Sequence, residues 1–180
     1  PGETNFRMAD VIVINKCDSA SEKNIRIVEE NAKKANPNAI IIRAKSDLSV
    51  KHSELLAGKK VVVVEDGPTT THGGMEFGAG SLMAKKLKCK IADPRKNAVG
   101  SIKKTFQKFS HLKNVLPAMG YSKKQITELE QTINRTPCDA VISGTPINLG
   151  RLLKVKKPLF DVHYEMDKQS AKKLEALLKR

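Results

Sequence analysis

The chain of 180 residues fits a single domain with a substantial core, and we expect one domain over residues 1–180. Its hydrophobic content of 39% and charged content of 29% exclude a disordered chain. The net charge of +14 indicates a solvated lysine-rich surface or, as the alternative, anionic partners such as nucleotides or phosphorylated metabolites. Nucleic acid is a disfavoured partner, because aromatic residues make up only 4% of the chain and base stacking needs them.

The cysteines and the apolar stretches indicate where such a protein resides. Cys17, Cys89 and Cys138 lie far apart and form no C-x-x-C motif, a pattern typical of reduced thiols in the cytoplasm. The four histidines are also scattered, which argues against a structural zinc site. No apolar stretch approaches the roughly 20 residues that a membrane span needs. We therefore expect a cytoplasmic protein with no membrane partner, and the sequence leaves homo-oligomerisation open.

Apolar, β-branched segments recur along the chain and predict strands. They cover residues 10–14, 39–43, 60–65, 89–92, 114–116, 140–143 and 159–164. Helical spacing of apolar residues predicts helices between them. The first begins at a capping box, Ser19-x-x-Glu22, and later ones follow the apolar faces of residues 75–87, 102–109, 122–133 and 171–178. This alternation indicates an α/β fold, with a mainly parallel sheet and helices on both faces.

The loops that follow the strands are the candidates for a functional site. In parallel sheets the ligand lies beyond the carboxyl ends of the strands. We expect six loops on that one edge, covering residues 15–18, 44–46, 66–74, 93–96, 117–120 and 144–148.

Asn15-Lys-Cys-Asp18 directly follows the first strand, as the base-reading N-K-x-D loop does in P-loop GTPases. Asp18 would accept two hydrogen bonds from a guanine edge and so reject adenine. Lys16 would lie along the base, and Asn15 would hold the loop to its neighbours. Ala44-Lys-Ser46 follows the next strand, where these proteins carry a second base-contacting loop, so Ala44 and Ser46 join the predicted nucleotide site. The alternative is a turn that caps the following helix.

The loop after the valine-rich strand has the composition of a phosphate site. Small glycines, threonine hydroxyls and the backbone N–H groups at a helix start all suit a phosphate group. The predicted phosphate-binding residues are Gly67, Thr69, Thr70, Thr71, Gly73 and Gly74. His72 and Asp66 are the predicted catalytic residues, with His72 as an acid/base group. The alternative is a strand-to-helix turn with a structural histidine.

Two arginines and two carboxylates complete the predicted site. Arg95 and Arg151 would hold a phosphate or carboxylate bidentately, although an Asp93–Arg95 surface pair is an equally simple reading. Glu65 and Asp66 would hold Mg²⁺ through water.

The chain contains no G-x-x-x-x-G-K-[ST] phosphate loop. We therefore expect a P-loop NTPase-like fold that lacks the phosphate-loop half, as the C-terminal part of a larger nucleotide-binding core. The upstream part of the same protein would then be a partner of this one.

Several segments together resemble the C-terminal half of cyclic 2,3-diphosphoglycerate synthetase, a family of P-loop GTPase-like proteins. The resemblance extends along essentially the whole chain, and Glu65-Asp-Gly-Pro68 followed by His72-Gly-Gly74 is its most specific part. The segments that carry it are Pro1-Gly-Glu-Thr-Asn5, Arg7-Met-Ala-Asp10, Asn15-Lys-Cys-Asp18, Val64-Glu-Asp-Gly-Pro68, Thr71-His-Gly-Gly-Met75, Asp93-Pro-Arg95, Val99-Gly-Ser101, Val115-Leu-Pro-Ala-Met-Gly-Tyr121 and Ser143-Gly-Thr-Pro146.

The resemblance implies an ATP-dependent ligase that closes a phosphoanhydride within 2,3-diphosphoglycerate and releases ADP and phosphate. The cofactors would be Mg²⁺ and a nucleotide. The nucleotide is ATP or GTP, because the family is associated with ATP whereas the N-K-x-D loop argues for guanine. The second hypothesis is a regulatory GTPase or nucleotide-binding module of the same fold with no metabolite substrate.

We predict that the isolated 180-residue chain does not hydrolyse nucleotides. Phosphoryl transfer depends on positioning and charge neutralisation around the phosphates, and the phosphate-loop motif is missing here. Phosphate release from ATP and GTP should match the buffer blank. Turnover by the purified chain that disappears in the Asp66→Ala variant would contradict the prediction.

Overall fold

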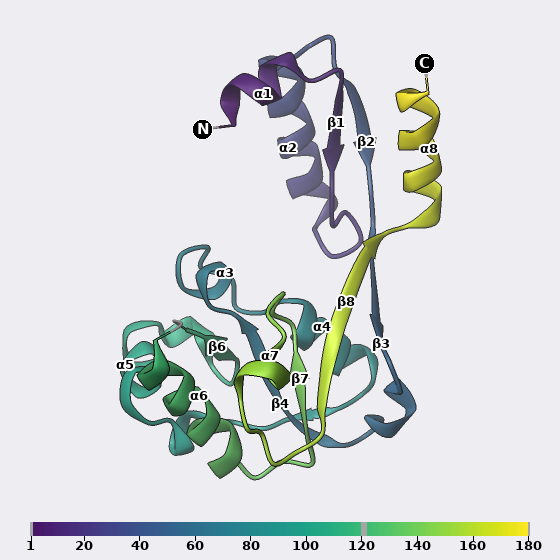
Figure 1. Cartoon of the computed structure of the whole chain (residues 1–180). Helices are drawn as coiled ribbons and strands as arrows, with labels where there is room; N and C mark the ends of the chain where they lie inside the picture. Colours follow the sequence, from purple (N-terminus) through teal and green to yellow (C-terminus); the bar gives the residue numbers. More distant parts are fainter. Residues whose placement is uncertain (1, 120–121, 180) are drawn as a thin grey trace. The chain divides into compact units, whose positions relative to one another are not determined.

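The computed structural model describes residues 2–119 and 122–179, and its contacts divide the chain into two compact units (Figure 1). Unit 1 contains the described residues up to Asp47 and from Tyr164 onward, and unit 2 contains Leu48–His163. The single domain over residues 1–180 stays a prediction, because compactness does not test whether the units fold independently. The parts of the resembling segments that fall on Pro1, Gly120 and Tyr121 lie outside the described residues.

Unit 1 contains a two-stranded sheet in which β1 and β2 are parallel. Its elements are α1 (Glu3–Met8), β1 (Val11–Ile14), α2 (Glu22–Ala35), β2 (Ile40–Arg43) and α8 (Lys168–Leu178). Ile25 and Ala32 are the buried residues of α2, so this helix covers the sheet along a narrow stripe. The predicted strands and helices of this unit therefore form, although α2 has Ser21 as its N-cap instead of Ser19.

The larger sheet has six strands in the order β3-β8-β7-β4-β5, with β6 also paired to β4. The strands are β3 (Ser46–Val50), β4 (Lys60–Asp66), β5 (Lys90–Ile91), β6 (Leu116–Ala118), β7 (Ala140–Ser143) and β8 (Leu159–Met166). β4 pairs in parallel with β5, β6 and β7, and β7 pairs in parallel with β8. The sheet is therefore mainly parallel, as predicted. Both β3 and β8 cross the boundary between the units.

Helices cover both faces of β4, because its side chains alternate between two cores. Val62 and Val64 pack in one core with Ile102 of α5 (Gly100–Lys108) and with residues of α6 (Lys123–Arg135) and α7 (Leu149–Leu152). Val61 and Val63 pack in the other core with Met83 of α4 (Ala79–Lys86). In Figure 1, α5 and α6 lie together and apart from α4. The α/β fold class with helices on both faces is confirmed.

Several short elements escaped prediction. The segment after β4 is not a loop throughout, since α3 spans Gly67–Thr71. In residues 45–59 the sequence predicts a loop with a short helix; the structure has the 3-10 helix Ser53–Leu55 there, but also the strand β3. Further 3-10 turns cover Arg95–Asn97 and Ser110–Leu112. Among residues 2–119 and 122–179, every helix is too short or too polar to cross a membrane.

The expectation of six loops on one sheet edge is wrong. Loops 15–18 and 44–46 follow β1 and β2 of the two-stranded sheet in unit 1. The loops after β4, β5, β6 and β7 follow parallel strands of the larger sheet and share its carboxyl edge, as far as residue 119 in the case of β6. The sequence could not distinguish these sheets, because strands of both have the same composition.

Gly67, the first residue of α3, lies very close to the backbone of β6. A Cβ atom at this position would lie 2.2 Å from the backbone oxygen of Ala118, which belongs to β6. The backbone after β4 can therefore turn into α3 only if residue 67 has no side chain.

We predict that Gly67→Ala lowers the free energy of unfolding by about 1–3 kcal/mol, the usual cost of overpacking. Gly150→Ala is the matched control, because a Cβ there meets nothing nearer than 3.4 Å and the residue is exposed on α7. Urea denaturation should show a loss for the first variant and little change for the control. Equal stability of both variants would contradict the close approach.

Candidate functional site

The N-K-x-D loop of unit 1 is held by hydrogen bonds to its own backbone. The Asn15 side chain accepts from the Lys16 N–H at 2.8 Å, and Cys17 Sγ donates to the Ile14 carbonyl at 3.1 Å. Lys16 has φ of 61°, in the left-handed region that lysine seldom adopts. Asn15 therefore bonds within the loop, whereas its predicted bond to the neighbouring loops stays a prediction, and Lys16 and Asp18 remain exposed.

The two predicted base-contacting loops meet at Asp18. Its Oδ1 accepts from the Ser46 N–H at 2.9 Å, and the Ala44 carbonyl accepts from the Cys17 N–H at 3.0 Å. The structure therefore brings Asp18 and Ser46 together. Because its Oδ1 accepts from Ser46, Asp18 has its second oxygen left to bind a base. The Ala44 N–H donates to the Ile14 carbonyl, so it offers no donor to a base.

Asp167 and Tyr164 join this loop cluster from the other end of unit 1, and neither was predicted. Asp167 accepts from the Lys45 N–H at 2.8 Å and from the Ser170 N–H at 3.0 Å, which fixes the start of α8 on the loop. Hydrogen bonds from Ser170 and from the Lys45 backbone lower the pKa of Asp167 to about 2. Lys16 Nζ lies 6.0 Å from the centroid of the Tyr164 ring, within reach of a cation–π interaction.

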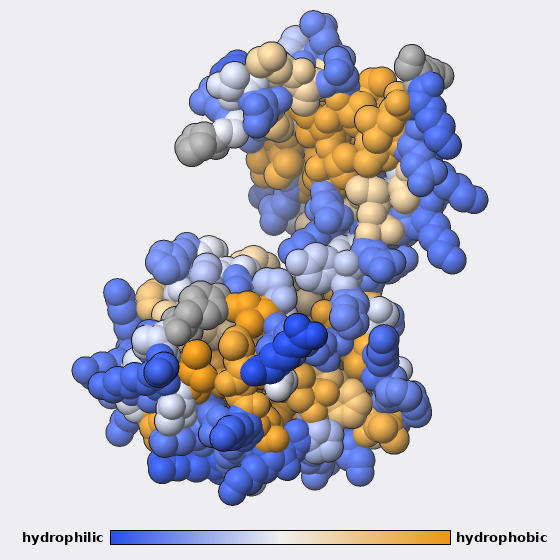
Figure 2. Space-filling view, in the orientation of Figure 1, coloured by the Kyte–Doolittle hydropathy of each residue, from blue (hydrophilic) through white to orange (hydrophobic). Residues whose placement is uncertain are grey.

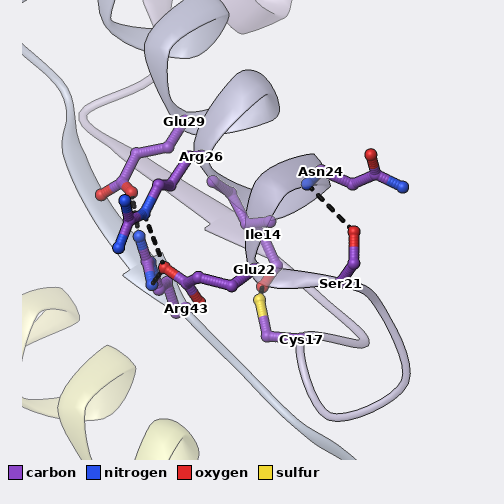
Figure 3. A network of polar contacts seen from close by, with 8 residues as sticks. All are labelled: Ile14, Cys17, Ser21, Glu22, Asn24, Arg26, Glu29 and Arg43. Atoms are coloured by element: carbon purple, nitrogen blue, oxygen red, sulfur yellow. Dashed lines mark hydrogen bonds and ion pairs between the residues drawn. The ribbon is translucent and has the colours of Figure 1, made fainter.

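An ion-pair network ties β2 to α2 beside these loops (Figure 3). The Arg43 guanidinium lies between Glu22 at 2.9 Å and Glu29, and its hydrogen bonds lower the pKa of both carboxyls. Glu22, predicted as part of a capping box, instead pairs with Arg26 and Arg43. The network links α2 to β2 at the surface and does not involve Asn15, Lys16 or Asp18.

In unit 2, the Glu65 carboxylate is buried at the start of α4. Its Oε1 accepts from the Ser81 N–H at 2.7 Å, the Ser81 hydroxyl at 2.9 Å and the Gly78 N–H at 3.1 Å. Its Oε2 accepts from the Gly80 N–H at 3.3 Å. A carboxylate of the protein therefore occupies the position at this helix start where a phosphate would bind.

Asp66 caps α3 with one of its two oxygens. Oδ2 accepts from the Thr69 N–H at 3.2 Å and the Thr69 hydroxyl at 2.7 Å. Because neighbouring strand residues point to opposite faces, the structure does not bring Glu65 and Asp66 together. Across the part of the chain that the structure describes, no three His, Cys, Asp or Glu side chains gather where they could hold a metal ion. The Mg²⁺ site stays a prediction, and this geometry does not favour Glu65 as a ligand.

The predicted phosphate-binding threonines use their hydroxyls inside α3. Thr70 and Thr71 donate to the Gly67 carbonyl at 3.0 and 2.8 Å, and both residues are buried. His72 is exposed at the end of α3, with Nδ1 3.1 Å from the Thr71 hydroxyl. Gly73 and Gly74 follow and are exposed. Among the predicted groups of this segment, Thr69, His72, Gly73 and Gly74 are therefore the accessible ones.

The two predicted arginines have different surroundings. Arg95 forms a bidentate pair with Asp93 at 2.6–3.0 Å, which lowers the pKa of the Asp93 carboxyl. The alternative reading of a surface pair around a turn thus describes the structure better than a free anion clamp. Arg151 is exposed on α7, a short helix that Asn148 caps by accepting from the Arg151 N–H at 3.1 Å.

The ends of β4 and β7 define the candidate site of unit 2. β5 and β6 lie on one side of β4 and β7 lies on the other, so the chain changes direction across the sheet here. In open α/β sheets ligands bind at such a point, beyond the carboxyl ends of the strands. The Gly144 N–H donates to the Val64 carbonyl at 2.7 Å, which places loop 144–148 beside the segment that begins at Asp66. Thr145 and Asn148 belong to this loop, which the sequence placed at the functional edge without naming either as a site residue.

The class of protein follows from this fold: it is an α/β protein with a mainly parallel sheet. No family model matches the sequence. Over 179 residues, or 99% of this chain, the sequence is 54% identical to the arginine synthetase ArcE of Thermococcus kodakarensis. The match covers 40% of the length of that protein.

The buried Glu65 carboxyl predicts a pH-dependent stability. Burial raises its pKa above the usual value of 4.5, so the folded chain holds this proton more tightly than the unfolded chain does. Stability from this group is therefore lost as the pH rises above 4.5 through the raised pKa. Compared with Glu65→Gln, the wild type should lose free energy of unfolding in urea denaturation as the pH is raised from about 4.5.

Glu128→Gln is the control, because the pKa of the Glu128 carboxyl is shifted in the opposite direction. Hydrogen bonds from the Ser101 hydroxyl and N–H lower the pKa of Glu128 below 4.5, so its contribution to stability grows as the pH rises toward 4.5. A wild-type advantage over Glu65→Gln that grows with pH would contradict the assignment for Glu65.

Proposed function

We propose that residues 1–180 form part of a nucleotide-dependent synthetase, and that its product is arginine. The observation that carries the proposal is the 54% identity to an arginine synthetase across 99% of this chain. Because the match covers 40% of that protein, the activity would belong to a longer protein. ATP or GTP and Mg²⁺ belong to the proposal as cofactors.

Each unit has its own proposed role. In unit 1, the exposed side chains of Lys16 and Asp18 would contact the nucleotide base. In unit 2, Asp66, His72 and Arg151 would act on the substrate at the ends of β4 and β7, with Asp66 and His72 as the catalytic pair. The part of the protein outside these residues would supply the phosphate-binding loop. A cytoplasmic location is part of this proposal and is supported by three cysteines without a disulfide.

A second candidate is the cyclic 2,3-diphosphoglycerate synthetase reaction, with 2,3-diphosphoglycerate as substrate. The observation in its favour is the series of matching segments, above all Glu65-Asp-Gly-Pro68 and His72-Gly-Gly74. Both candidates are ligations, so they differ in substrate and product and not in the class of reaction. A regulatory module would bind the nucleotide and make neither product.

Isotope exchange tests the proposal even while the second substrate is unidentified. The longer protein that carries these residues would be incubated with Mg²⁺, ADP, ATP and labelled phosphate, with and without arginine. We expect label in ATP only when arginine is present. Phosphorus NMR of a separate reaction with 2,3-diphosphoglycerate and ATP or GTP should show no cyclic anhydride. The cyclic product without arginine-dependent exchange would select the second candidate, and nucleotide binding with neither signal would select the regulatory module.

Variants in unit 2 test the residue roles. Asp66→Ala and His72→Ala should each lower kcat by about 100-fold or more, the usual effect of losing a general acid or base. His163→Ala is the control, because His163 is exposed on β8 and has no role in the proposed chemistry. An unchanged kcat in both site variants would reject these roles.

A further inference from the structure

Two polar groups at the carboxyl end of β7 are buried without a hydrogen-bond partner. They are the Ser143 hydroxyl and Oδ1 of Asp161, and neither bonds to another group of the described residues. Ser143 is the last residue of β7 and is fully buried, and it pairs in register with Asp161 of β8. Leaving such a group unpaired costs about 1–3 kcal/mol, so the pair indicates a position built for a partner.

Both side chains lie on the face of the sheet that α5, α6 and α7 cover. Val141 and Leu159 pack in that core and precede Ser143 and Asp161 by two residues, and strand residues two apart point to the same face. Neighbouring strands stand about 5 Å apart, so the hydroxyl and the carboxylate are neighbours. In Figure 1, β8 runs beside β7 on the side away from β4. Asp161 is partly exposed, which places the pair at the border of the core.

The Asp161 carboxylate stands apart from the other acidic groups of this basic unit. Residues 48–163 contain 20 Lys and Arg residues against nine Asp and Glu residues, and Figure 2 shows hydrophilic side chains over much of the visible surface of unit 2. Every other acidic side chain of the unit lies within 3.5 Å of a nitrogen or hydroxyl group. Oδ1 of Asp161 accepts from no donor among the described residues. A negative charge that this lysine-rich unit leaves unpaired is suited to a cation from outside.

We propose that Asp161 binds the guanidinium group of arginine, and that the Ser143 hydroxyl turns to donate to the bound carboxylate. The inference rests on the proposed function, because that proposal supplies arginine as the ligand. A carboxylate and a guanidinium form a charge-assisted pair of fitting geometry. The hydroxyl hydrogen rotates freely, so Ser143 is a positioning residue for the carboxylate.

The guanidinium end of arginine fits this position better than its α-ammonium end. A guanidinium is more weakly hydrated than an ammonium, so it loses less on entering the border of an apolar core. The α-ammonium also stands beside the α-carboxylate of arginine, which the negative charge of Asp161 would repel.

Two other occupants fit less well. Mg²⁺ favours an octahedral set of oxygen ligands, and no three His, Cys, Asp or Glu side chains gather in the part of the chain that the structure describes. An ordered water would bond to both groups but would leave the charge of Asp161 unpaired. Neither would make the affinity for arginine depend on Asp161.

Calorimetric titration of the longer protein with arginine tests the proposal. Asp161→Asn keeps the shape of the side chain and removes its charge, and it should raise the Kd of arginine by about 10-fold or more, the usual effect of losing a hydrogen bond to a charged group. Asp139→Asn is the matched control, because it removes the same charge from an exposed carboxylate that accepts from the Lys60 N–H at the other end of β7. An unchanged Kd in Asp161→Asn, or an equal rise in both variants, would overturn the proposal.

Two arginine analogues identify the end of the ligand that Asp161 binds. The compound γ-guanidinobutyrate keeps the guanidinium without an α-ammonium, and norvaline keeps the α-ammonium without a guanidinium. Competition with arginine should show that Asp161→Asn weakens the binding of γ-guanidinobutyrate and leaves that of norvaline unchanged. The reverse pattern would overturn the assignment of the guanidinium.

Unfolding measurements distinguish a binding role from a structural one. Without ligand, Asp161→Asn and Ser143→Ala should be about as stable as the wild type, because neither side chain has a hydrogen bond to lose. Arginine should raise the melting temperature of the wild type more than that of Asp161→Asn. A larger loss of stability in Asp161→Asn than in Asp139→Asn would mark the carboxylate as structural and overturn the proposal.

This proposal and the proposed function fail separately. Guanidinium binding that depends on Asp161, in a protein without arginine-dependent exchange, would reject the synthetase and support this site. Arginine-dependent exchange with the same KM for arginine in the wild type and in Asp161→Asn would support the synthetase and overturn this site.

Discussion

The buried carboxylate of Glu65 is the interaction on which the centre of unit 2 depends. It leaves β4 on the same face as Val61 and Val63 and accepts hydrogen bonds from the first residues of α4. The loop after β7 must pass close by, since a Cβ at Gly144 would lie 2.2 Å from Glu65 Oε2. One side chain thus joins the central strand, a helix start and the neighbouring loop. Removing it would leave several buried N–H groups without a partner, which costs about 1–3 kcal/mol for each group.

The same arrangement recurs at α5 and limits how this protein can bind anions. Glu128 accepts from both the N–H and the hydroxyl of Ser101, so α5 also begins against a carboxylate from elsewhere in the fold. Helix starts are the usual phosphate sites of α/β proteins, and here two of them are filled by the protein's own acidic groups. A phosphorylated substrate in unit 2 would therefore depend on exposed groups such as Thr69, His72 and Arg151, or on a part of the protein outside these residues.

Local patterns predicted much of the fold and part of the candidate site. The predicted strand 140–143 matches β7, and the helix predicted from Ser122 matches α6, because β-branched residues mark the strand and the Ser122 cap, with Leu129 and Ile133 at helical spacing, marks the helix. The helix α3 was missed because Gly-Pro followed by three threonines is typical of a turn, and only the Asp66 cap and internal hydroxyl bonds stabilise it as a helix. Asp18 and Ser46 are joined by a hydrogen bond, whereas the contact of their loops with a base stays a prediction.

The sequence by itself determined that this is an α/β protein with a mainly parallel sheet, because the order of apolar strands and amphipathic helices is a local property of the chain. It also indicated which loops end strands. Only the tertiary structure decided how those loops divide between two sheets and which polar side chains are already occupied. Arg95 is paired with Asp93, Thr70 and Thr71 bond within α3, and Glu65 is buried against α4. Composition could not reveal which side chains are already bonded. Their hydrogen-bond partners are often distant in sequence, and they meet only when the sheet forms.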